Sequence, residues 1–166
     1  MTCQNCGAGM HRDGERELWV CDYCDSSQSP ERTHDGIRVF ESVTGRNCPI
    51  CAQPLVEASV TGSSADYCRK CGGVLMRVGA FLDAQAALRV WMADAAPTRT
   101  AADPSELDRH IHCPGCGRVM DTHFYGGGGS VVIDNCPDCE WNWFDRSELM
   151  RASQPSENRA VSLPSD

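Results

Sequence analysis

The sequence has no long hydrophobic run and few aromatic residues. Aromatic residues make up 7% of its 166 residues, so the composition does not imply one large core. The length suits one ordinary domain or several very small ones. No apolar stretch approaches the roughly 20 residues of a membrane span or the 7–15 of a signal-peptide core. We therefore expect a cytoplasmic protein without a membrane segment.

The sequence also lacks any cysteine outside a Cys-x-x-Cys pair. Taken two pairs at a time, the pairs are separated by 14, 16 and 19 residues, with longer gaps of 23 and 41 residues between the couples. This spacing indicates a threefold repeat of one small unit. The predicted ligand sets are Cys3, Cys6, Cys21 and Cys24 (site 1); Cys48, Cys51, Cys68 and Cys71 (site 2); Cys113, Cys116, Cys136 and Cys139 (site 3).

The spacing within each unit suits tetrahedral zinc, which takes four thiolates at about 2.3 Å. One Cys-x-x-Cys turn supplies two sulfurs, and an intervening β-hairpin can bring a second turn to the opposite side of the ion. In the third unit, "VMDTHFY" and "SVVID" are strand-like on either side of "GGGG". We therefore predict a small, metal-stabilised, β-rich fold with three tandem zinc ribbons and three Zn²⁺ ions.

The residues around the cysteines agree with tight metal-binding turns. Proline follows the first cysteine of a pair three times, and glycine follows the second cysteine three times. Proline presets φ for a turn, and glycine accepts a left-handed conformation. These residues are Pro49, Pro114, Pro137, Gly7, Gly72 and Gly117.

Other uses of the cysteines are less compatible with the sequence. A thioredoxin-like dithiol needs a βαβ context, which is missing, and a simple metal store should lack the aromatic and aliphatic residues found between these turns. Oxidation that ejects zinc stays open, because every thiolate is chemically competent. The five histidines are surplus as ligands, although His110 and His112 precede Cys113 closely enough for an outer contact.

The second and third units, residues 48–82 and 113–150, resemble the zinc-finger family named after transcription factor IIB. In that family, two knuckles precede a segment similar to Gly-Gly-x-Trp-Leu-Asp-x-Gly-Glu-Leu, and the match is closest around Trp143 and Asp145. The resemblance implies zinc binding and a ribbon fold, but not a transcription function. The second unit departs from the pattern with Leu75, Arg77 and Ala80, and the first unit is only a generic ribbon.

A helix is predicted after the second ribbon and a short helix after the third. Asp145 and Glu148 have the spacing of a capping box, which should start a short helix through Met150, whereas Arg77 and Ala80 cannot form one. A carboxylate pair for acid–base work is the alternative use of Asp145 and Glu148. The helix after the second ribbon must then depend on packing.

The predicted organisation assigns a small core to each ribbon, with linkers that let the ribbons move. A Cys→Ser change should then unfold mainly its own unit. Residues 37–43 can add a strand within the first linker. The predicted segments are 1–30 (ribbon 1), 31–47 (linker), 48–95 (ribbon 2 with its helix), 96–110 (linker), 111–152 (ribbon 3 with its short helix) and 153–166 (disordered tail).

The helix after the second ribbon is amphipathic and extends far from its zinc. One apolar stripe runs from Phe81 to Ala95. At about 1.5 Å per residue, Trp91 lies some 15 Å beyond Phe81, and this far end of the helix needs another cover. A neighbouring ribbon, a second copy of the chain or a partner's groove could supply that cover. We predict a partner surface at Leu88, Trp91 and Met92.

The charge favours protein over nucleic acid as the partner. The chain has a net charge of −8 and one lysine, Lys70, and three Zn(Cys)₄ centres would bring the charge to about −14. Nucleic-acid binders usually carry a basic stripe, although a local contact through Arg69 and Lys70 stays open. We expect a non-catalytic zinc adaptor without a small-molecule substrate. The alternatives are a transcription-associated nucleic-acid binder and a thiol-based redox or zinc-responsive regulator.

Overall fold

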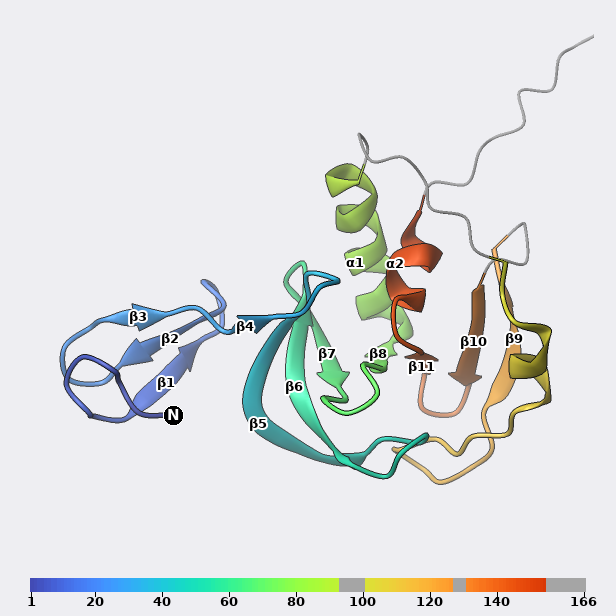
Figure 1. Ribbon diagram of the computed structural model, residues 1–166, viewed down its shortest axis with the longest axis horizontal. Helices are drawn as coiled ribbons and strands as arrows, with labels where there is room; N and C mark the ends of the chain where they lie inside the picture. Colours follow the sequence, from blue (N-terminus) through green and yellow to red (C-terminus); the bar gives the residue numbers. More distant parts are fainter. Residues whose placement is uncertain (93–100, 127–130, 155–166) are drawn as a thin grey trace, which may run out of the picture.

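The computed structural model describes residues 1–92, 101–126 and 131–154 (Figure 1). Four expectations fall wholly or partly outside these residues: Ala95 in the apolar stripe, positions 96–100 of the second linker, positions 127–129 of the glycine turn, and the tail after Gln154. Within the described ranges, the chain is β-rich, with a helix after the second ribbon and a short helix after the third. The predicted fold class is confirmed.

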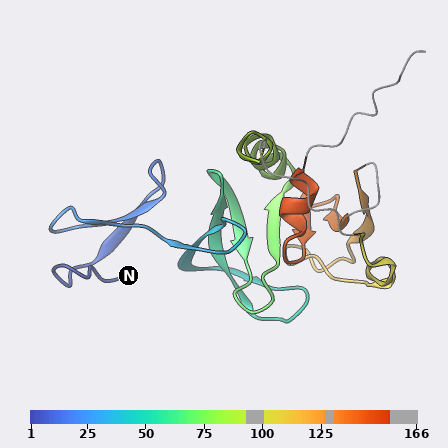
Figure 2. The same cartoon turned by 45° about the horizontal axis from the view of Figure 1, so that its top comes forward.

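The N-terminal unit is a separate three-stranded antiparallel sheet. It contains β1 (Met10–Asp13), β2 (Leu18–Cys21) and β3 (Ser27–Gln28), in that order. In Figures 1 and 2 this sheet lies to one side of the larger sheet, to which the chain continues through the strand β4 (Glu31–Arg32).

The second and third units form one larger sheet. Its strand order is β4-β5-β6-β7-β8-β11-β10-β9. The predicted hairpin of the third unit is present, since β9 and β10 pair antiparallel with Tyr125 opposite Val131. The remaining strands are β5 (Arg38–Asn47), β6 (Pro54–Val60), β7 (Ser63–Tyr67), β8 (Val74–Arg77), β9 (Asp121–Tyr125), β10 (Val131–Cys136) and β11 (Trp141–Phe144).

The two ribbons in this sheet are related by an approximate two-fold axis. Strands β8 and β11 pair antiparallel, with Leu75 directly opposite Trp143. Each of these residues lies four positions after the last cysteine of its unit, Cys71 and Cys139. Strand β8 is the last strand of the second ribbon and β11 is the last strand of the third, and they pair through corresponding residues. Two ribbons of one chain therefore join much as two identical subunits would join in a symmetric dimer.

Strand β5 connects the N-terminal ribbon to the larger sheet. It pairs with β6, and it places Phe40 in the core of the first ribbon, where the rings of Phe40 and Trp19 make an edge contact with centroids 5.9 Å apart. Glu17 of the first ribbon also accepts hydrogen bonds from Arg38 and Ser59. The expectation that each ribbon has its own core is therefore wrong, because a ribbon of this size cannot bury enough apolar surface by itself.

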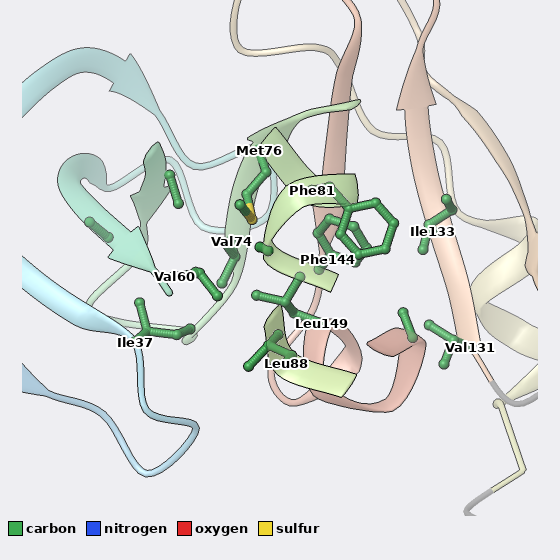
Figure 3. Close-up of a cluster of buried hydrophobic side chains, with 14 of the residues drawn as sticks. Ile37, Val60, Val74, Met76, Phe81, Leu88, Val131, Ile133, Phe144 and Leu149 are labelled. Atoms are coloured by element: carbon green, nitrogen blue, oxygen red, sulfur yellow. The ribbon is translucent and has the colours of Figure 1, made fainter. Parts of the chain in front are cut away.

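Both helices pack on the core that the second and third units share. Helix α1 (Val78–Trp91) lies beside α2 (Glu148–Ser153) in Figures 1 and 2. Arg77 precedes α1 without a capping hydrogen bond from its side chain, so packing holds the helix, as expected. Figure 3 shows its residues Phe81 and Leu88 facing Phe144 and Leu149 of the third unit.

The predicted partner surface on α1 needs correction. Leu88 and Met92 are buried in the shared core, 4% and 9% exposed, whereas Trp91 is 72% exposed. Leu88 and Met92 are covered by the chain itself, because Ile37 and residues of the third ribbon belong to the same cluster. Only Trp91 among the three residues is available to a partner.

Residues 101–110, expected as part of a linker, are anchored to the third ribbon. They form a 3-10 helix, η1 (Pro104–Asp108), followed by Arg109. The Arg109 guanidinium bonds Asp134 at 2.7 Å and Asp145 at 2.5 Å. Although burial acts in the opposite direction, the two carboxylates raise the pKa of Arg109. Pairing with Asp134, which is fully buried, fixes this segment against the sheet.

The predicted capping box before α2 forms only in part. Glu148 accepts a hydrogen bond from the Asp145 amide at 2.7 Å, but the Asp145 carboxylate accepts from Trp143 Nε1 and Arg109 rather than from the helix amides. Helix α2 accordingly begins at Glu148, after Ser147 in a left-handed conformation. The Asp145 carboxylate is therefore engaged by the buried Trp143 ring and the partly buried Arg109 guanidinium instead of the helix amides.

The burial of Glu148 predicts that the stability of the fold depends on pH. Burial raises its pKa from 4.5 to about 7, so the folded chain holds this proton more tightly than the unfolded chain. The resulting stabilisation is complete below pH 4.5 and is lost as the pH rises through 7. Glu148→Gln cannot ionise, so its stability relative to wild type should rise by about 1.4 kcal/mol between pH 6 and 8.5. Urea unfolding of the metal-loaded proteins checks this, and a difference independent of pH would contradict it.

Among the described residues, no helix is long and apolar enough to span a membrane.

Candidate metal centres

The structure brings the twelve cysteines together in three groups of four. The groups are the three predicted sets, and within each group all four Sγ atoms lie within 4.8 Å of one another. The described residues show no disulfide, and all twelve cysteines are free. Each group can therefore offer four sulfur ligands to one metal ion.

The sulfur separations fit a tetrahedral ion. Bonds of about 2.3 Å to four thiolates place the sulfurs about 3.8 Å apart. The separations are 3.4 Å for Cys6 and Cys21, 3.5 Å for Cys48 and Cys71, and 3.7 Å for Cys116 and Cys136. These separations, together with the 4.8 Å limit on every pair, lie around the value for zinc geometry, so the donor atoms fit the metal.

The turns that carry the cysteines are built alike. In the turn at Cys48, the Ile50 amide points at Cys48 Sγ at 3.4 Å, and the Ala52 amide bonds the Cys48 carbonyl at 2.9 Å. Equivalent amides point at Cys3, Cys21 and Cys113. Such donors stabilise a thiolate, because the N–H dipole faces the charge. These amides therefore favour the thiolate form of the cysteines, which is the form that binds a metal ion.

The residue after each second cysteine has a positive φ in all six turns. Glycine occupies three of these positions, as predicted for Gly7, Gly72 and Gly117. The other three positions hold residues with a Cβ atom, for which this conformation costs about 1 kcal/mol. Those residues are Asp25, Ala52 and Glu140, at φ 54°, 56° and 55°.

Ala52→Gly should stabilise the metal-loaded protein. Glycine removes the left-handed strain at φ 56°, and we expect a gain of about 0.5–1 kcal/mol after its greater unfolded-state entropy is counted. Ala86→Gly is the matched control, because the same change on the exposed face of α1 should cost about 1 kcal/mol. Thermal unfolding of both variants measures the two effects, and a loss of stability in Ala52→Gly would contradict the strain.

The first site differs from the others in its hydroxyl neighbour. Ser26 Oγ lies 3.1 Å from Cys3 Sγ and 3.0 Å from Cys24 Sγ. Hydrogen bonding to Ser26 lowers the pKa of Cys24 to about 6. The sequence analysis did not identify Ser26, although a serine two residues after a ligand cysteine can indicate a hydrogen bond to the metal-binding sulfurs. Its hydroxyl favours the thiolate that a metal ion requires.

The second and third sites border one apolar cluster. Trp143 and Leu75 are fully buried in this cluster together with cysteines of both sites. Gly73 makes room for the indole, because a Cβ atom at this position would lie 2.1 Å from Trp143 Cζ2. The two metal centres therefore share a single packed support, and Trp143 is its largest side chain.

The histidines stay outside the metal groups, as expected. Among the described residues, the compact four-ligand groups contain cysteine alone. His112 Nδ1 lies 3.0 Å from the Gly117 carbonyl oxygen, which places this histidine against the turn of site 3. His11 pairs with Asp22 at 2.6 Å on the surface.

Comparison with protein families supports the interpretation of these centres. Residues 47–89 and 112–154 both match the family described as transcription factor zinc-finger, a zinc ribbon of the transcription factor IIB type. Comparisons with curated proteins and with solved structures find no match. The two matched segments cover just over half of the chain and contain the second and third tetracysteine groups. The chain therefore belongs to the transcription factor zinc-finger family.

Proposed function

We propose that the chain binds three zinc ions and acts as a non-catalytic adaptor through contacts with another protein. Each set of four cysteines would hold one Zn²⁺, which links two turns and supplies folding free energy rather than a reaction. The close clustering of four sulfurs in each group and the family match support zinc as the metal. Free thiols throughout agree with the reducing cytoplasm as the location.

The observation that carries the adaptor proposal is the exposure of Trp91. Its side chain is 72% exposed at the end of α1, beside Val90 at 79%. A large aromatic residue in water is a typical anchor of a protein interface. Trp91 also borders a cavity of about 200 Å³ whose other walls include charged side chains, namely Glu17, Arg32, Asp35 and Arg38. An apolar anchor with a charged rim suits a protein partner.

Trp91→Ala tests this contact without disturbing the core. Leu88 is buried, so changing it would confuse lost binding with lost folding. Leu82→Ala is the matched control, because Leu82 is 52% exposed and lies nine residues away, on the opposite side of the helix. We expect both variants to keep the metal and the unfolding temperature of wild type.

The two variants should differ in partner capture. Proteins retained from the native host by wild type and by Leu82→Ala should be absent with Trp91→Ala, as measured by affinity capture and mass spectrometry. Sedimentation of the purified variants distinguishes a second copy of the chain from another protein. Equal capture by Trp91→Ala and Leu82→Ala would overturn the proposed surface.

Binding to nucleic acid should be weak. With a net charge of −8, or about −14 once three zinc centres are formed, the chain should bind random duplex DNA more weakly than the roughly 10⁻⁴–10⁻⁶ M of non-specific binders at physiological salt. A gel shift measures this. Submicromolar binding that falls with salt would favour the transcription-associated alternative over the adaptor.

A further inference from the structure

The two-fold relation between the second and third ribbons places one arginine–aspartate pair in each. Asp66 lies two residues before Cys68, and Asp134 lies two residues before Cys136. Arg46 bonds Asp66 through two nitrogens, at 2.5 and 3.2 Å. In the third ribbon, Arg109 bonds Asp134 at 2.7 Å. The arginines lie at different spacings, two residues before Cys48 and four residues before Cys113, but each binds the aspartate at the equivalent position of its ribbon.

The surroundings of the two pairs differ by a reversal of charge. Six residues after the last cysteine, the third ribbon has Asp145, which gives Arg109 a second carboxylate at 2.5 Å. The second ribbon has Arg77 at the equivalent position. In the third ribbon the Asp145 carboxylate is a second partner of Arg109. In the second ribbon the cation of Arg77 stands in place of that carboxylate.

Arg77 has no acidic partner in the described part of the chain. Its Nη1 donates to the Cys139 carbonyl oxygen at 3.0 Å, and its guanidinium lies 4.9 Å from the ring centre of Trp141. The Arg46 guanidinium lies 5.1 Å from the same ring. Two cations therefore converge on one indole, and the single carboxylate of Asp66 bonds only Arg46 among the residues described.

A cavity of about 400 Å³ opens at this point. Strand β7 pairs with β8 only at Asp66 and Tyr67, so its first residues separate from β8. Ser64, Arg46, Arg77 and Trp141 line the space. The volume lies within the range of small-molecule sites.

The first ribbon contributes a third guanidinium group to the lining of this cavity. Arg12 also lines the cavity and pairs with Glu57 at 3.2 Å, and its buried Nε has no hydrogen-bond acceptor among the described residues. Three arginines thus face two carboxylates, Glu57 and Asp66, which leaves an excess positive charge in a chain whose net charge is −8.

We propose that this cavity binds a small organic anion through its carboxylate or phosphate group. The anionic group lies at Arg46 and Arg77 and takes the place that the Asp145 carboxylate has beside Arg109 in the third ribbon. Guanidinium groups bind both kinds of oxyanion through paired N–H donors. The apolar part of the ligand packs against Trp141. This site is independent of the Trp91 contact and adds ligand binding to the proposed adaptor function.

Isothermal titration of the metal-loaded chain with phenyl phosphate and with benzoate tests the site. Both probes carry a flat ring and one anionic group, and the comparison between them decides between phosphate and carboxylate as the preferred group. We expect saturable binding of at least one probe in the millimolar range in buffer with physiological chloride. No heat of binding with either probe would overturn the proposal.

Charge variants locate the binding. Arg77→Asp introduces the carboxylate that the third ribbon has, and it should weaken the binding at least about tenfold. Arg89→Asp changes the net charge equally on the exposed side of α1 and should change the binding less than about twofold. Equal weakening by the two variants would mean a general charge effect and would overturn the site.

A second variant separates binding from metal retention, because Arg77 also holds the Cys139 carbonyl. Ser64→Glu places a carboxylate in the cavity from an exposed strand position and leaves that hydrogen bond intact. It should also weaken binding at least about tenfold while the metal content equals that of wild type. Undiminished binding by Ser64→Glu would contradict the location.

Discussion

Gly73→Ala should destabilise the joined sheet by about 3 kcal/mol or more. The added methyl group would lie 2.1 Å from the Trp143 ring, and contact this close cannot be relieved by the far end of a flexible side chain. Either the strands β8 and β11 separate or the indole leaves the cluster between the second and third metal centres. Overpacking costs about 1–3 kcal/mol, and loss of a buried tryptophan costs about 3–5 kcal/mol.

Gly79→Ala is the control for this substitution. Gly79 lies in α1, and a methyl group there would meet nothing within 4 Å. Alanine should therefore stabilise the helix by about 0.5–1 kcal/mol. Urea unfolding of both variants, loaded with metal, measures the difference. Similar stabilities for the two variants would show that Trp143 does not fill the space over Gly73.

Cys48→Ser should weaken metal binding in the third ribbon as well as in its own. Both centres border the cluster that contains Leu75 and Trp143, and β8 and β11 join the two ribbons along four residue pairs. Structural zinc contributes on the order of 10 kcal/mol to folding in small domains, so losing one centre should loosen the shared sheet. This result differs from the unit-by-unit unfolding expected from the sequence.

Cys6→Ser provides the comparison, since the first site has a sheet of its own and a separate cluster around Trp19. At a chelator concentration that removes one metal ion from Cys6→Ser, the Cys48→Ser variant should have lost two. Native mass spectrometry counts the ions that remain. Loss of a single ion from each variant would show that the ribbons unfold independently.

The sequence was sufficient to predict the metal groups because their geometry is local. Four cysteines at short, regular spacing can meet through one hairpin, and glycine at Gly7, Gly72 and Gly117 identifies the left-handed turn residue. The same turn conformation at Asp25 could not be predicted, because there the metal-binding turn imposes a φ that the residue type does not favour.

The relation between the ribbons could not be predicted in this way. The pairing of Leu75 with Trp143 joins strands 68 positions apart, and no turn or spacing in the sequence specifies it. The sequence places Phe40 in an extra strand of the linker, but in the structure its side chain completes the core of the first ribbon. The periodicity of α1 correctly identified a buried stripe from Phe81 to Met92, apart from the exposed Trp91. Whether the far end of the helix meets a partner or the same chain depends on long-range packing.

The charge reversal at Arg77 was visible in the sequence as a departure from the family pattern. Its consequence needed the structure, because only the structure shows that Arg46 and Arg109 pair with the equivalent aspartates Asp66 and Asp134. The convergence of Arg46 and Arg77 on Trp141 likewise depends on the β8–β11 pairing, which brings Arg77 opposite Trp141.

The most direct test is the metal content of the protein purified without chelator. Elemental analysis, together with titration of the thiols before and after metal release, should find three zinc ions per chain and no disulfide, because the structure supplies three complete sets of four cysteine sulfurs. One zinc ion or none per chain, or thiols already oxidised to disulfides, would contradict the assignment of the three centres.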